Sequence, residues 1–136
     1  MTGRHAFEYA LLRVVPRIER GEAFNAGVLL YCRPLDYLGA RVHLDRHRLA
    51  ALDPDADGVV IGRALDAVVA MCGAGRAEAA RYSGPAGAED RGRRFRRLTA
   101  PRSTIVQAGP VHTGLTADPK TELDRLLESL VLPLST

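Results

Sequence analysis

The stretch YALLRVVPRIERGEAFNAGVLLYCR, residues 9–33, decides the fold because it predicts two strands joined by a charged turn. Residues 6–15 alternate between two apolar sets, which is typical of a strand covered on both faces. Residues 23–33 alternate again and predict one face made of Phe24, Ala26, Val28, Leu30 and Cys32, with Asn25 and Gly27 together on the other. Because the connection is short, the two strands are expected to pair antiparallel.

The rest of the chain predicts an α+β fold. Residues 38–44 alternate as a third strand, which completes a meander, and residues 102–107 predict a fourth that ends at Gly109 and Pro110. Apolar residues at helical spacing predict a helix that begins after DPDADG (53–58) and stops at Gly73 or Gly75. We therefore expect one domain over residues 1–136, with an antiparallel sheet of three or four strands and two longer helices packed against it.

Capping residues mark the remaining helices. Asp45 is expected to cap a short helix over RHRLAAL (46–52), and a helix from residue 89 or 90 should reach about Leu98. The last helix has Asp118 as its cap and Pro119 at its first position, and it ends before Pro133. Its apolar stripe is expected to be core and comprises Leu123, Leu126, Leu127, Leu130 and Val131.

Composition limits the class of protein. The chain has 136 residues, of which 46% are hydrophobic and 26% charged, as in ordinary globular domains. It contains no apolar run of membrane-spanning length and no secretory signal at its start, so a cytoplasmic protein is expected. Cys32 and Cys72 are predicted to be buried free thiols, and no cysteine or histidine spacing predicts a metal site.

Arginines are concentrated in one segment. Residues 91–102 hold six arginines and no acid, although the whole chain has a net charge of only +3. This segment is a candidate surface for a partner or nucleic acid, with Arg93, Arg94, Arg96 and Arg97 as its contact residues. The alternative is a solvated helix face.

A second candidate site is polar and cationic. Arg102, Ser103 and Thr104 combine a guanidinium with two hydroxyls after a proline, which suits a phosphate or carboxylate. We expect Arg17 in the charged turn and Asn25 beside it to converge with these three residues at one end of the sheet. Alternatively, the turn is a solvated hairpin tip whose charges pair locally, and Asn25 bonds to the backbone.

Signals of catalysis are weak. Ser103, Thr104, His112 and Asp118 are residue types used in nucleophilic catalysis, but no nucleophile elbow surrounds the serine. His43 and His47 span an expected strand-to-helix boundary, so they do not form the pair of metal ligands that a continuous helix would present. No catalytic residue or cofactor is assigned.

Two blocks resemble a known family. YALLRVVPRIERGEAFNAGVLLYCR (9–33) and RFRRLTAPRSTIVQAGPVHTGL (94–115) resemble the signature blocks of domain-of-unknown-function family 3037. DYLGARVHLD (36–45) and ALDPDAD (51–57) resemble the middle of that family. The family's recurrent polar positions fall on Arg13, Arg17, Glu19, Asn25, Arg102, Ser103, Thr104 and Gln107. The resemblance implies a small bacterial protein without established activity, often encoded beside a HipA-like kinase.

The expected function is therefore an accessory protein without catalytic activity that docks a kinase-like partner, or an anionic ligand, through the cationic site. Nucleic-acid or nucleotide binding through residues 91–102 is one alternative. A small enzyme acting on a phosphorylated or acylated substrate is the other. The sequence leaves the oligomeric state open.

Overall fold

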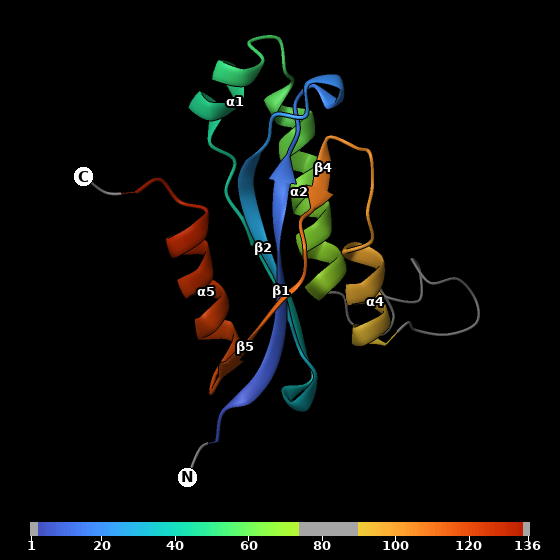
Figure 1. Cartoon of the computed structure of the whole chain (residues 1–136), viewed down its shortest axis with the longest axis vertical. Helices are drawn as coiled ribbons and strands as arrows, with labels where there is room; N and C mark the ends of the chain where they lie inside the picture. The colour runs from blue at the N-terminus through green and yellow to red at the C-terminus, as the bar shows by residue number, and fades with distance from the viewer. Residues whose placement is uncertain (1–2, 74–89, 135–136) are drawn as a thin grey trace.

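The computed structural model describes residues 3–73 and 90–134 and confirms an α+β fold. Figure 1 shows a twisted antiparallel sheet with helices on both faces. Strands β1 (His5–Val14), β2 (Phe24–Cys32) and β3 (Tyr37–Val42) form the predicted meander, in the order β3-β2-β1. The described helices are α1 (Arg46–Leu52), α2 (Gly58–Gly73), α4 (Arg91–Leu98) and α5 (Pro119–Leu130).

The free edge of β1 is shared by two short strands where the sequence predicted one. β4 (Val106–Ala108) pairs with the end of β1, and β5 (His112–Thr116) pairs with its beginning. The predicted strand over 102–107 is thus shorter and starts later, and β5 was not predicted. β5 gave no signal in the sequence because Leu115 is the only large apolar residue among His112–Thr116, so the segment does not alternate in hydrophobicity.

Each sheet face has its own core. α5 packs Leu123, Leu126 and Leu127 against one face, where they meet a cluster that includes Val28 and Leu30. α2 and α4 cover the other face, over clusters that include Leu12, Val14, Phe24, Leu29, Ile61, Leu65, Cys72 and Phe95. The two longer helices therefore lie on opposite sides of the sheet, as Figure 1 shows.

A β-bulge in β2 changes which residues face each helix. Leu12 pairs with Gly27, but the next residue of β1, Arg13, pairs with Asn25, so Ala26 is an extra residue on β2. Because side chains alternate along a strand, one extra residue reverses every later position. The expectation that Asn25 and Gly27 share a face is therefore wrong.

The two residues flanking the bulge have different surroundings. A Cβ added at Gly27 would lie 2.9 Å from the backbone oxygen of Arg41 and from Val42 Cγ1, so neighbouring chain fills the space beside this glycine. Asn25 instead donates from Nδ2 to the backbone oxygen of Leu130 at the end of α5, at 3.1 Å.

Side-chain caps fix where the helices begin, and those of Asp45 and Asp118 are as the sequence predicted. The carboxylates of Asp45, Asp57, Asp90 and Asp118 accept backbone N–H groups in the first turns of α1, α2, α4 and α5, respectively. The predicted stop at Gly75 lies outside the described residues, as do residues 83–89 of SGPAGAEDRG (83–92), which the sequence predicts as a loop. Among the described helices, none has the length and apolar character needed to cross a membrane.

Truncation of Leu127 tests whether the predicted apolar stripe of α5 is part of the core. Leu127 is 4% exposed whereas Leu130 is 37% exposed, so Leu130 lies at the margin of the core. Leu127→Ala should lower the free energy of unfolding by about 2–5 kcal/mol, since it leaves a cavity. Leu130→Ala in the same helix is the control and should cost much less in urea denaturation. Equal losses in the two variants would contradict this packing.

Candidate functional site

The groove, our name for a hollow of about 630 Å³, lies between α2 and the chain that leads from α4 into β4. Its lining is mainly apolar and includes Ile18, Val60, Ala64, Ala67, Met71, Leu98 and Ile105. Its rim carries the predicted anion-binding residues Arg102, Ser103 and Thr104. The structure thus places these three residues beside exposed apolar side chains.

α2 supplies most of the groove because it is apolar over more than one face. Ile61 and Leu65 point into the core, while Val60 lies one position away and is 56% exposed. Ile18, in the short 3-10 helix η1 (Ile18–Arg20), and Ile105 close the groove from other parts of the chain. The sequence did not predict that these apolar residues form a site. The one signal was that α2 has more apolar residues than the side facing the core requires.

Arg102, Ser103 and Thr104 differ in how many of their side-chain hydrogen-bond donors are still available to a ligand. Arg102 donates from Nη2 to the backbone oxygen of Arg97 at 3.2 Å, so most of its guanidinium donors remain available. Thr104 donates its hydroxyl to the backbone oxygen of Val106 at 2.7 Å. The Ser103 hydroxyl makes no hydrogen bond to the described residues and is exposed. Arg102 and Ser103 are therefore the groups at this rim that can receive an anion.

The structure does not bring Asn25 together with Arg102. The chain before β4 does begin beside the charged turn, because the backbone N–H of Val15 donates to the oxygen of Ile105 at 2.7 Å. However, the bulge turns Asn25 to the α5 side of the sheet, and the groove lies on the α2 side. The single site expected from Arg17, Asn25 and Arg102 is therefore divided between two faces.

Arg17 is already engaged by carboxylates. Its Nε lies 3.5 Å from Oδ2 of Asp53, whose side chain is 10% exposed, and its Nη1 lies 3.7 Å from Oε1 of Glu19. Arg20 and Glu22 form a further ion pair in the same turn. The charged turn is thus neutralised locally, while its apolar residue Ile18 contributes to the groove.

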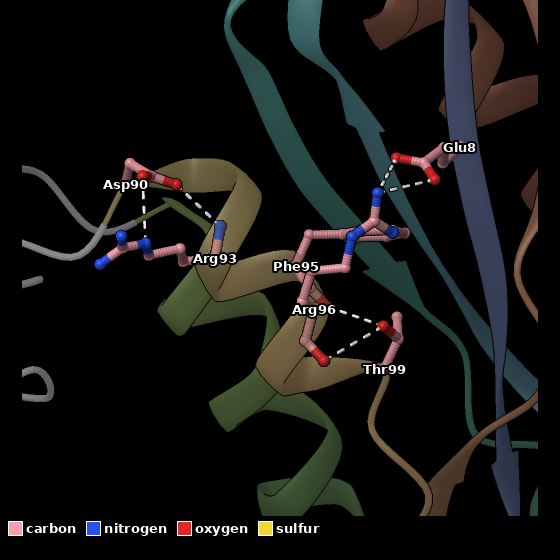
Figure 2. Close-up of polar contacts among 6 residues, drawn as sticks. All are labelled: Glu8, Asp90, Arg93, Phe95, Arg96 and Thr99. Carbon is pink, nitrogen blue, oxygen red and sulfur yellow. Dashed lines mark hydrogen bonds and ion pairs between the residues drawn. The ribbon is translucent and has the colours of Figure 1, made fainter.

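The arginines of α4 are largely paired. Figure 2 shows Arg96 reaching from α4 to Glu8 on β1, with Nη2 2.7 Å from Oε2, and Arg93 beside the capping residue Asp90. Arg91 contacts Asp36 at 2.9 Å. These carboxylates cancel much of the local charge that made the segment a candidate nucleic-acid surface.

Arg94 differs from the other predicted contact residues because it is buried. It is 4% exposed and donates from Nη1 to the backbone oxygen of Met71 on α2 at 3.2 Å. Arg94 therefore ties α4 to the end of α2 and is not available as a surface contact. Arg97 is half-buried, and its backbone oxygen accepts from Arg102.

The polar groups considered for catalysis are far apart. Ile105 and His112 lie beside Val15 and Tyr9, respectively, and six residues of extended strand span about 20 Å. Ser103 lies near the end of β1, whereas His112 pairs with Tyr9 in the middle of that strand, so the two side chains are well separated. Among residues 3–73 and 90–134, no group of three or more His, Cys, Asp or Glu side chains is placed to hold a metal ion.

Both cysteines are free and buried, as predicted. Cys32 donates from Sγ toward the backbone oxygen of Ala6 at 3.5 Å. Burial raises the pKa of the Cys72 thiol to about 12, an effect that the charge of Arg94 partly opposes. Neither thiol is placed to react while the protein is folded.

The comparisons assign the chain to a family. A small α+β protein with an apolar groove and a cationic rim is the class that the fold and site define. The chain belongs to the family described as "Protein of unknown function (DUF3037)", which matches residues 9–131. No curated protein and no solved structure matches it.

Thiol reactivity provides a test of the buried Cys72. At pH 8 a thiol-specific reagent should modify the folded protein slowly, because a thiol with a pKa near 12 is almost wholly protonated and burial blocks access. In denaturant both cysteines should react rapidly with the reagent, and the rate of modification is measured by absorbance. Fast modification of Cys72 without unfolding would contradict its burial.

Arg94 and Arg93 form a matched pair for testing the role of α4. Arg94→Ala should lower the free energy of unfolding by roughly 1–3 kcal/mol, since it removes a charged hydrogen bond and buried packing. Arg93→Ala should leave stability nearly unchanged, because its ion pair is exposed. Thermal denaturation of both variants would measure the difference. A larger loss in Arg93→Ala would refute this assignment.

Proposed function

We propose that the protein is an accessory protein without catalytic activity that docks a partner protein through the groove. The occupant that fits is a segment with apolar side chains next to a carboxylate. The observation that carries the proposal is the apolar lining of the groove together with the available guanidinium of Arg102 at its rim.

Apolar exposure favours a protein segment as the occupant. Ile18, Val60 and Ile105 are 46%, 56% and 39% exposed, and all three line the same hollow. Clusters of exposed apolar side chains with a polar rim are typical of interaction surfaces. Their burial by a partner would contribute about 25 cal/mol for each Å² removed from water.

The rim favours a negative charge in that segment. Arg102 retains guanidinium N–H groups that can form a two-bond contact with a carboxylate, and the Ser103 hydroxyl can supply another donor. Of the partners considered, a HipA-like kinase is the one to which the family resemblance points. We therefore propose that such a kinase presents an apolar and acidic segment to this groove.

Nucleic-acid binding has less support. Arg91, Arg93 and Arg96 each pair with a carboxylate, so a phosphate backbone would have to displace those acids. Binding carried by phosphate contacts would also weaken steeply with salt. Docking through an apolar groove is expected to depend much less on salt.

Two neighbouring valines of α2 provide a sharp test. Val60 lines the groove, whereas Val59 is similarly exposed at 53% but is not part of its lining. Val60→Asp should weaken binding of a purified HipA-like kinase by roughly tenfold or more, because an unpaired carboxylate would be buried. Val59→Asp should bind like the unmodified protein in isothermal titration calorimetry.

Arg102→Glu tests the charge at the rim. It should also weaken kinase binding, because the carboxylate of the partner would face another carboxylate. Equal affinity of the unmodified protein, Val60→Asp and Arg102→Glu for the kinase would refute docking at the groove. No binding of the kinase by any of them would refute the kinase as partner.

A further inference from the structure

Three polar side chains form a row across the sheet on the face opposite the groove. Arg13 on β1 pairs with Asn25 on β2 and with Gln107 on β4. Directly paired residues share a face, with Cβ atoms about 5 Å apart. The row therefore places Arg13 between Asn25 and Gln107 on one face at the end of the sheet.

Arg13 has an unusual environment for an arginine of this chain. Arg13 is half-buried, yet its side chain makes no hydrogen bond or ion pair with any described residue. The other described arginines that lack such a partner are exposed, namely Arg4, Arg33, Arg46 and Arg63. A partly desolvated guanidinium without an acceptor is unfavourable, so an external acceptor would stabilise it.

Gly109 creates the space in which the guanidinium lies. A Cβ added at Gly109 would be 3.1 Å from Arg13 Cζ and 3.2 Å from both Nε and Nη2. The arginine head therefore rests on the glycine backbone between β4 and β5. This contact fixes its position on the sheet without using any of its hydrogen-bond donors.

The two amides are held in place by the backbone. Asn25 Nδ2 donates to the oxygen of Leu130 at 3.1 Å, and Gln107 Nε2 donates to the oxygen of Thr104 at 2.7 Å. Each amide nitrogen carries a second N–H that can bind a ligand. The last turn of α5 therefore borders the row at Asn25.

We propose that the guanidinium of Arg13, held against Gly109 in the polar row that Arg13 shares with Asn25 and Gln107, is a binding site for the oxyanion of a small molecule, either a carboxylate or a phosphate. The guanidinium would donate two parallel bonds to the oxyanion. This site does not depend on the groove, because Val106 and Gln107 are adjacent on β4 and face opposite sides of the sheet.

NMR titration with inorganic phosphate and with acetate tests the proposal, at constant ionic strength set by chloride. The readout is the Nε–Hε resonance of each arginine together with the backbone amide resonances of β4, which report on the site when Arg13 is absent, in the unmodified protein and in the variants Arg13→Gln, Gly109→Ala and Arg33→Gln. The Arg13 resonance should shift and saturate with at least one of the two anions, and that anion identifies the ligand class. Binding should be at least tenfold weaker in Arg13→Gln and unchanged in Arg33→Gln, which removes an exposed arginine without a partner.

Gly109→Ala tests whether the position of the Arg13 guanidinium matters, because it changes the contact under the guanidinium without changing the charge. The new Cβ would lie 3.1–3.2 Å from Arg13 Cζ, Nε and Nη2, so the flexible head must move by a few tenths of an ångström, and anion binding should weaken modestly at unchanged net charge. The titration of the unmodified protein keeps the proposal testable if Arg13→Gln fails to fold. The proposal is overturned if neither anion shifts the Arg13 resonance, or if Arg13→Gln binds as tightly as the unmodified protein.

Discussion

The β-bulge at Ala26 is the constraint on which the rest of the structure depends. It reverses the alternation of β2: Val28 and Leu30 pack toward α5, while Phe24 and Ala26, which would otherwise face the same side, pack toward α2. Without the extra residue, Phe24 would leave the α2 core and Asn25 would enter it. A buried amide without a partner costs free energy, whereas here the amide meets the last turn of α5.

The same bulge separates the two candidate sites. The groove lies on the α2 side with Arg102 at its rim, and the row of Arg13, Asn25 and Gln107 lies on the α5 side. β4 contributes to both, because successive residues of a strand point to opposite faces. The short edge of the sheet therefore connects two surfaces of different chemistry, one apolar with a cationic rim and the other polar.

Charge counted along the sequence overstates the free positive charge of α4. The run of six arginines between residues 91 and 102 has no acid within it, but Glu8 and Asp36 reach it from β1 and the β2–β3 connection. Arg94 is buried and donates a hydrogen bond to the backbone oxygen of Met71 on α2, so its charge is not exposed. These acids are more than 50 residues away in sequence, so only the folded chain shows that they meet the arginines.

The sequence by itself determined the features that depend on near neighbours. The first three strands, the carboxylate caps of the helices and the core stripe of α5 through Leu123, Leu126 and Leu127 follow from local spacing and side-chain chemistry. Only the tertiary structure decided the register at the bulge, the pairing of β5 and the grouping of Ile18, Val60 and Ile105 in the groove. The physical reason is that these features arise from contacts between distant segments, and one residue of register reverses every face that local alternation assigns.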